Sequence, residues 1–290
     1  MDQELLSYPK SGKSLIADGA TGTMLMAAGL APGTPPELWN LENPEQVLAL
    51  HRFYLDAGSQ IILTNTFGGS SIKLARFGLG SSARDINLAA ARLARQAASE
   101  KAYIAGDMGP TGELMSPMGS LTYDLAYETF SEQASALAEG GVDAIWVETM
   151  SDLEEARAAV SAAVKSTHLP VFCSFSFTRK ARTIMGVSPR QAAAELWPLG
   201  LAAFGANCGE GLEMIPEVLR QIKEAVPDAV LIAKPNAGLP RMVEGNPVYD
   251  VDPPEFSAQM LEYIKLGAQV VGACCGSRPA YISALSAQID

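Results

Sequence analysis

The chain alternates between short apolar runs and longer stretches in which apolar residues recur at helical spacing. The short runs are rich in β-branched and aliphatic residues, which is typical of strands, and most are followed by an Ala-rich helical stretch. The expected strands span Leu15–Asp18, Gln60–Thr64, Tyr103–Asp107, Ala144–Glu148, Val171–Phe175, Ala203–Asn207, Val230–Lys234 and Gln269–Ala273. The expected helices between them span Pro44–Ala57, Ile86–Ser99, Tyr123–Glu139, Asp152–Ser166, Pro189–Leu199, Met214–Ala225 and Pro254–Leu266.

The predicted strands are continuous apolar runs, and strands of this kind are buried on both faces of a parallel sheet. Eight strand–helix units close naturally into a (β/α)8 barrel, the TIM barrel of the α/β class. A doubly wound open sheet is the alternative, but it requires no particular number of units and leaves two sheet edges exposed. No Pro-, Gly- or Ser-rich linker divides the chain. We therefore expect a single barrel domain over residues 1–290.

Composition and net charge indicate a globular chain and restrict the kinds of molecule that it is expected to bind. Hydrophobic residues make up 48% of the chain and charged residues 18%, which is enough for a large core. A net charge of -11 argues against nucleic acid or an anionic membrane as a partner, because both attract basic surfaces. The first segment, MDQELLSYPKSGK, contains acidic residues and lacks an apolar stretch, so we expect no secretory signal or membrane span and a cytoplasmic location.

The four cysteines are too few for a disulfide scaffold, and clustered cysteines in a reducing compartment indicate metal binding or catalysis. Cys208 follows the sixth predicted strand, and Cys274 and Cys275 follow the eighth. Active sites of this fold lie at the carboxyl ends of the strands, so barrel closure is expected to gather these three thiols in one sector. Neighbouring residues of a strand point to opposite faces, so the pair can share an ion only if the backbone turns, which Gly276 permits.

Three cysteine ligands with an open fourth position are expected of a catalytic zinc site. A free thiol has a pKa of roughly 8.5 or above, and zinc deprotonates it. Zinc with three thiolates carries a formal charge of about -1, so a fourth thiolate stays nucleophilic and can accept a methyl group. The alternatives are buried core cysteines, which is our interpretation of Cys173, and a strained Cys274–Cys275 disulfide.

Five segments at the predicted strand ends resemble the homocysteine-binding methyltransferase domain family. This domain occurs in cobalamin-dependent methionine synthase and in betaine- or S-methylmethionine-dependent homocysteine methyltransferases. The resemblance covers nearly the whole chain and implies a (β/α)8 barrel, zinc on the three cysteines and homocysteine as the methyl acceptor. The segments that carry it are Asp18–Thr23, Thr64–Phe67, Gly205–Gly209, Pro235–Gly238 and Gly272–Gly276.

A homocysteine bound through its sulfur still presents an ammonium and a carboxylate. Glu148 and Asp18 end the fourth and first predicted strands, where they are placed to receive the ammonium. Backbone N–H groups of Gly19–Thr23, which include that of Thr21, and of Gly68–Gly69 are expected to receive the carboxylate. The structural alternatives are that Asp18 braces a turn and that Glu148 caps the next helix.

Asn236 ends the seventh predicted strand, between the two that carry cysteines. We expect it to hydrogen-bond the substrate or to take the open zinc position when no thiol is bound, with a simple Asn-Ala-Gly turn as the alternative. Asn65, followed by Thr66 and Phe67, is expected to line the mouth of the barrel.

The methyl donor is predicted from one segment. Ala233–Pro240 is more similar to the cobalamin-dependent type than to the S-methylmethionine type, so we expect methylcobalamin or a related methyl-corrinoid as donor. The chain leaves no room for the folate, cobalamin and activation domains of a full-length synthase, so we expect the corrinoid on a separate partner protein. The alternatives are direct use of S-methylmethionine or betaine, and a non-catalytic zinc- or thiol-binding sensor.

Overall fold

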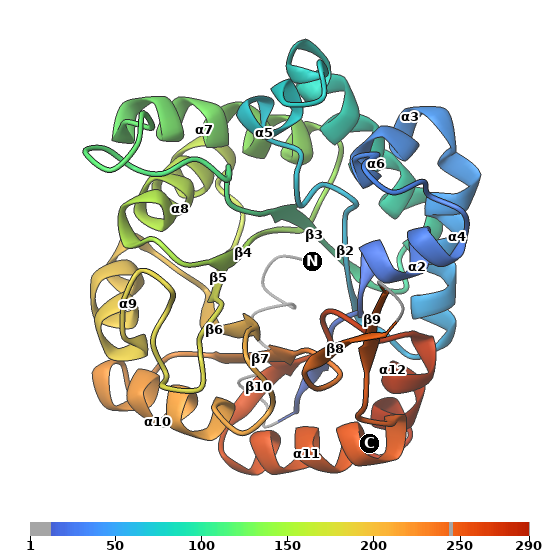
Figure 1. The fold of residues 1–290 in the computed structure, drawn as a ribbon, viewed down its shortest axis with the longest axis vertical. Coiled ribbons are helices and arrows are strands. Elements are labelled where there is room, and N and C mark those ends of the chain that lie inside the picture. The colour runs from blue at the N-terminus through green and yellow to red at the C-terminus, as the bar shows by residue number, and fades with distance from the viewer. Residues whose placement is uncertain (1–12, 244–245, 290) are drawn as a thin grey trace.

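The computed structural model describes residues 13–243 and 246–289, and at its centre a parallel sheet is rolled into a barrel (Figure 1). The strands follow the order β1-β10-β7-β6-β5-β4-β3-β2, and a parallel bridge between Ala17 and Ile61 joins the first to the last. The predicted (β/α)8 barrel is therefore confirmed, and the open-sheet alternative is wrong. The ends of the predicted domain, residues 1–12 and 290, lie outside the described residues. The barrel strands are β1 (Leu15–Ile16), β2 (Ile61–Leu63), β3 (Tyr103–Met108), β4 (Ala144–Met150), β5 (Val171–Phe175), β6 (Ala203–Cys208), β7 (Leu231–Pro235) and β10 (Ala268–Val271).

Helices surround the barrel on its outside (Figure 1). The seven predicted helices all form, with ends within three residues of the expected ones: α4 (Pro44–Asp56), α6 (Ala83–Ala98), α7 (Tyr123–Glu139), α8 (Leu153–Thr167), α9 (Pro189–Leu196), α10 (Ile215–Ala225) and α11 (Pro253–Lys265). Hydroxyl and carboxylate side chains begin several of them. Thr122, Asp152, Ser188 and Asp252 each accept a hydrogen bond from an amide of the first helical turn, which satisfies donors that the helix leaves unpaired.

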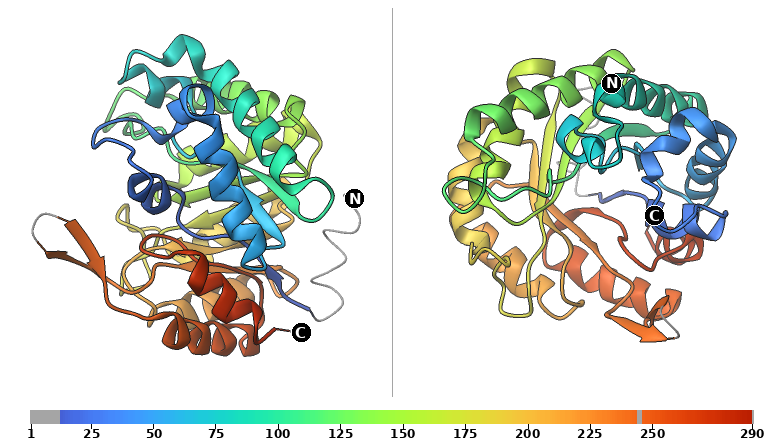
Figure 2. Two further views of the ribbon diagram at one scale, coloured as in Figure 1. Left: turned by 90° about the vertical axis from the view of Figure 1, so that its right-hand side faces the viewer. Right: turned by 45° about the horizontal axis from the view of Figure 1, so that its top comes forward.

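Shorter elements complete the loops after the strands. The helices among them are α2 (Thr21–Ala27), α3 (Trp39–Glu42), α5 (Ser71–Ala75), α12 (Pro279–Ser286) and the 3-10 turns η2 (Pro36–Leu38), η3 (Gly80–Ser82) and η4 (Trp197–Leu199). An antiparallel hairpin of β8 (Pro240–Val243) and β9 (Asn246–Tyr249) was not expected from the sequence, and it projects from the barrel in Figure 2. Such short elements show little periodicity in the sequence, because their stability comes from packing against the barrel.

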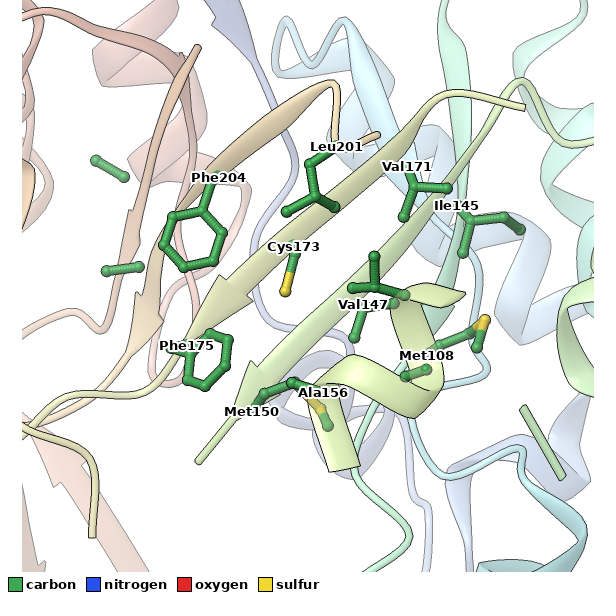
Figure 3. Packing of buried hydrophobic residues seen from close by; sticks show 14 of the residues in the cluster. Met108, Ile145, Val147, Met150, Ala156, Val171, Cys173, Phe175, Leu201 and Phe204 are labelled. Carbon is green, nitrogen blue, oxygen red and sulfur yellow. The ribbon is translucent and has the colours of Figure 1, made fainter. Parts of the chain in front are cut away.

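Successive strand residues alternate between two layers of the core. In β5, Phe172 belongs to the cluster inside the barrel, whereas Val171, Cys173 and Phe175 pack between the sheet and the helices. Figure 3 shows Cys173 surrounded by apolar side chains, including that of Phe204. Cys173 is 0% exposed, so its interpretation as a core residue is confirmed. Within the two described ranges, no helix is both long and apolar enough to cross a membrane.

Candidate active site

The three predicted ligands lie together at the carboxyl end of the barrel. Cys208 is the last residue of β6, and Cys274 and Cys275 lie just beyond β10, with β7 between them. Their Sγ atoms lie within 4.8 Å of one another, and those of Cys208 and Cys275 are 3.9 Å apart. Tetrahedral zinc with Zn–S bonds of about 2.3 Å separates its sulfurs by about 3.8 Å. The cluster therefore fits a zinc ion.

The backbone turns at both cysteine positions, as two sulfurs from neighbouring residues require. Cys208 has a φ of 59°, in the left-handed region that costs a non-glycine residue roughly 1–2 kcal/mol. Gly276 has a φ of 80°, and a Cβ there would lie 2.2 Å from Cγ of Tyr249, so only glycine fits. The predicted turn after Cys275 is confirmed. All four cysteines lie in the described part of the chain and are free, so the Cys274–Cys275 disulfide is wrong.

In the absence of a metal, all three thiols are protonated at neutral pH. A hydrogen bond with Cys274 lowers the pKa of Cys208, but a hydrogen bond with Cys275 and burial outweigh it and raise that pKa to about 11. A thiol with such a pKa is almost wholly protonated at pH 7, and metal binding requires its proton to leave.

Asn236 connects the two cysteine-bearing loops. Its Oδ1 accepts a hydrogen bond from the Cys275 N–H at 3.0 Å, and its Nδ2 donates to the carbonyl of Gly209 at 3.0 Å. Asn236 is only 5% exposed, and these two bonds orient the backbone that carries the thiols. Its expected contact with zinc or substrate stays a prediction.

The thiols open onto a cavity of about 1080 Å³ at the carboxyl ends of the strands. A second group of polar residues, which we call the charged pocket, lies at the same end and consists of Asp18, Asp107, Glu148 and Lys234. All four are buried, with exposures of 1%, 5%, 6% and 3%. Of the predicted substrate residues, Thr21, Asn65 and Glu148 line the cavity itself.

Lys234 holds the charged pocket together. Its Nζ lies 3.7 Å from Oδ1 of Asp18 and 3.7 Å from Oε2 of Glu148. Burial alone would lower the pKa of Lys234, but the Glu148 and Asp18 carboxylates outweigh it and raise that pKa above the usual value. Burial raises the pKa of Asp18 to about 6, although Lys234 opposes the shift. The lysine is therefore a charged counter-ion to the two carboxylates.

Asn207 joins the charged pocket to the thiols. Its Nδ2 lies 3.4 Å from Oε2 of Glu148 and 3.9 Å from Sγ of Cys274, and it donates to Thr149 Oγ1 at 2.6 Å. Its Oδ1 accepts from the hydroxyl of Ser174 at 2.7 Å. A fully bonded amide in this position fixes the spacing between the two parts of the site.

The structure also tests the structural alternatives for the two predicted carboxylates. Asp18 does brace the backbone, because its Oδ2 accepts from the Leu63 N–H at 2.8 Å, while its Oδ1 faces Lys234. Glu148 does not cap the next helix, because Asp152 is the N-cap of α8. Helix capping therefore does not explain why Glu148 is buried at this position.

The backbone N–H groups predicted to bind the substrate carboxylate at Gly68 and Gly69 have hydrogen-bond partners within the protein. The Gly68 N–H donates to Oε1 of Glu37 at 2.5 Å, and the Gly69 N–H donates to the carbonyl of Thr66 at 2.9 Å. Both glycine amides therefore already have acceptors within the protein, so the expectation that they bind a substrate carboxylate does not hold. The Nδ2 of Asn65 donates hydrogen bonds to the carbonyl of Pro36 and to Oδ1 of Asn40, so this side-chain amide also has partners within the protein.

Sequence reasoning missed Lys234, Asp107 and Asn207. Each stood at the last position of a predicted strand, and a charged or amide residue closing an apolar run was the available signal. Tyr249, which also lines the cavity, was missed for a different reason, because the hairpin that carries it was not predicted.

Comparison with known proteins agrees with this geometry. A family model described as homocysteine S-methyltransferase matches residues 15–289. The chain is 31% identical over 308 residues to methionine synthase of Mycobacterium tuberculosis, covering 99% of this chain and 25% of that protein. It is 30% identical to methionine synthase of Mycobacterium leprae, covering 95% of this chain and 24% of that protein. The chain thus spans about a quarter of the length of these curated relatives.

Among solved structures, the metallated form of the homocysteine methyltransferase MmuM from Escherichia coli shares the fold. It has a TM-score of 0.80 at 23% identity, over 95% of this chain and 96% of that one. Fold and site together define a barrel enzyme with a three-thiol centre beside a charged pocket. The chain belongs to the homocysteine S-methyltransferase family.

Proposed function

We propose that this enzyme binds zinc through Cys208, Cys274 and Cys275 and methylates homocysteine to methionine. The observation that carries the proposal is the convergence of three free thiols within 4.8 Å at a cavity that also contains buried carboxylates. Zinc supplies, when bound, the positive charge that keeps a substrate thiol deprotonated at neutral pH. Three cysteine ligands would leave a fourth position open to the substrate sulfur. The similarity to a metallated homocysteine methyltransferase supports the proposal that this site holds a metal.

The charged pocket orients the substrate. Glu148 and Asp18 receive its ammonium, which a buried carboxylate pair with a single lysine counter-ion favours electrostatically. Thr21, the first residue of α2, lines the same cavity and contacts the substrate carboxylate, and Asn65 lines the mouth. Asn236 keeps the two cysteine loops in register and contacts zinc or substrate from there. The substrate sulfur is thereby aimed at the open side of the cavity.

We further propose that the donor is a methyl-corrinoid, such as methylcobalamin, held by a separate protein. The likeness of Ala233–Pro240 to the cobalamin-dependent type and the identity of 30–31% to methionine synthases support this donor. The sulfur attacks the methyl carbon in line. The S–C bond forms as the bond between carbon and donor breaks, and the electron pair stays on the donor.

A donor screen with zinc-loaded protein tests the proposal. Homocysteine is offered with free methylcobalamin, S-methylmethionine or betaine, and methionine is measured by mass spectrometry. We expect methionine with methylcobalamin, and none from a Cys275→Ser control that lacks a zinc ligand. If methionine forms only with S-methylmethionine or betaine, that compound is the donor and the corrinoid proposal is wrong. Zinc-dependent homocysteine binding without methionine from any donor would favour a thiol sensor.

A further inference from the structure

Tyr249 lines the cavity beside the thiols but has no part in the proposed function. It ends β9, and its ring lies against Gly276, where an added Cβ would lie 2.2 Å from Cγ and 2.3 Å from Cδ2 of the ring. Gly276 directly follows Cys275 in the chain. The hairpin projects from the barrel (Figure 2), yet this ring packs on the loop that carries two of the thiols.

The position of Tyr249 is fixed at the base of the hairpin. The Ala237 N–H donates to the Cys275 carbonyl at 3.0 Å, and the Val251 N–H donates to the Ala237 carbonyl at 3.3 Å. Gly238, with a φ of 93°, comes so close to Val251 that a Cβ there would lie 2.7 Å from Cγ2 of the valine. Both ends of the hairpin are therefore tied to the loop of Cys275, and the contact made by Tyr249 is built into the fold.

Each of the three thiols has a hydrogen-bond partner outside the cluster. These partners are a side-chain amide, a backbone N–H and a phenol: Asn207 Nδ2 at 3.9 Å from Cys274 Sγ, the Gly209 N–H for Cys208, and the Tyr249 hydroxyl for Cys275. A sulfur that has lost its proton can only accept, so the phenol then donates to Cys275. A hydrogen bond donated to a thiolate stabilises the anion and lowers its nucleophilicity.

The proposed chemistry requires the protein thiolates to react more slowly than the substrate thiolate. A site that holds three cysteine thiolates beside a substrate thiolate contains four nucleophiles of the same kind. Cys274 is buried, whereas Cys208 and Cys275 are partly exposed. Methylation of Cys275 would convert a charged metal ligand into a neutral thioether and weaken the metal site.

We propose that Tyr249 is a positioning residue that protects Cys275 from methylation: its hydroxyl donates to the Cys275 sulfur and its ring covers the neighbouring backbone, so that the methyl group passes to the substrate sulfur. This inference rests on the proposed function, in which the thiolates share a zinc ion. In the side reaction that Tyr249 suppresses, the Cys275 sulfur forms the S–C bond as the bond between carbon and its leaving group breaks. The electron pair departs with the leaving group.

The test treats zinc-loaded protein with methyl iodide in the absence of homocysteine, so that no substrate thiol competes and iodide is the leaving group. Peptide mass spectrometry follows methylation of each cysteine with time. Tyr249→Phe keeps the ring on Gly276 and removes only the hydroxyl. We expect this variant to methylate Cys275 about three- to tenfold faster than the wild type, because part of the stabilisation of the thiolate is lost. The rate at Cys208 should stay the same.

Tyr281→Phe is the matched control. Tyr281 lines the same cavity, but its hydroxyl donates to the carbonyl of Val251 at 2.8 Å and not to a thiol. The variant therefore removes a phenol hydroxyl from the base of the hairpin without removing a donor from sulfur. It should methylate Cys275 at the wild-type rate. Tyr249→Ala removes the ring as well, and we expect it to accelerate methylation of Cys275 more than Tyr249→Phe does.

Zinc content is measured for every protein before methyl iodide is added, which separates the two proposals. A wild type that holds no zinc would overturn the proposed function itself. With zinc bound, equal rates at Cys275 in the wild type and Tyr249→Phe would overturn the role of Tyr249 alone. The same holds if Tyr281→Phe or the rate at Cys208 shows an equal acceleration, since a loosened loop would then be the cause. Loss of zinc from Tyr249→Phe would assign Tyr249 to metal retention and overturn protection.

Discussion

The thiol cluster and the charged pocket lie at the same end of the barrel but are held in different ways. The thiols depend on backbone turns: Cys208 has a left-handed φ of 59° and Gly276 one of 80°. The charged pocket depends on side-chain charges from separate strands, with Lys234 Nζ 3.7 Å from two carboxylate oxygens. Changes in the first region should therefore affect the metal, and changes in the second should affect the substrate.

The sharpest test of the thiol region is to remove a ligand. Cys208→Ser and Cys275→Ser should each reduce zinc from roughly one ion per chain to below about 0.1, because two thiolates hold zinc far more weakly than three. Metal analysis of the purified variants measures this. Cys173→Ala is the matched control, since Cys173 is buried in the core and should not change the zinc content. Equal zinc content in all variants would refute the site.

Glu148→Gln tests the charged pocket without touching the thiols. It replaces one proposed partner of the substrate ammonium with a neutral amide of similar shape. A hydrogen bond between charged groups contributes about 1.5–3 kcal/mol, so homocysteine binding should weaken by roughly 10- to 150-fold. Calorimetry measures the affinity, and zinc analysis should show no change. A parallel loss of zinc would mean that the two regions do not act separately.

Asn236→Ala tests whether zinc affinity depends on how the side chain of Asn236 holds the backbone of the two cysteine loops. The variant removes the bonds to the Cys275 N–H and the Gly209 carbonyl, so the cysteine loops lose their common brace. Residues that orient metal ligands typically contribute 10- to 100-fold, and we expect zinc affinity to fall within about that range. Competition with a zinc chelator measures it. An unchanged zinc affinity would show that the turns hold the thiols unaided.

The pH dependence of binding gives the smallest expected effect. Burial raises the pKa of Asp18 to about 6, so a proton competes with the substrate ammonium for this carboxylate below that pH. Homocysteine binding should therefore strengthen by about tenfold as pH rises from 5 to 7 and then level off. Dividing by the affinity for 4-mercaptobutyrate, which lacks only the ammonium, removes the titration of the thiol itself. The ratio should become independent of pH in Asp18→Asn, and a wild-type ratio that is already flat would contradict the assignment.

The predicted strands and the seven larger helices form because their apolar spacing encodes burial, and the three cysteines were found because strand ends meet at one end of a barrel. The hairpin of β8 and β9 could not be predicted, since its strands are short and its Tyr249 packs on Gly276 from a distant part of the chain. The contacts of Asn207 could not be predicted either, because its partners come from β4, β5 and the turn after β10.

The sequence by itself determined the barrel, its repeat of strand and helix, and the choice of the three clustered cysteines, because these depend on local periodicity and on residue type. Only the tertiary structure decided that Lys234 lies between Asp18 and Glu148, and that Asp107 shares their pocket. The physical reason is that charge balance in a buried site depends on which side chains point inward from strands far apart in the chain. That orientation follows from barrel closure and strand register, which no local pattern specifies.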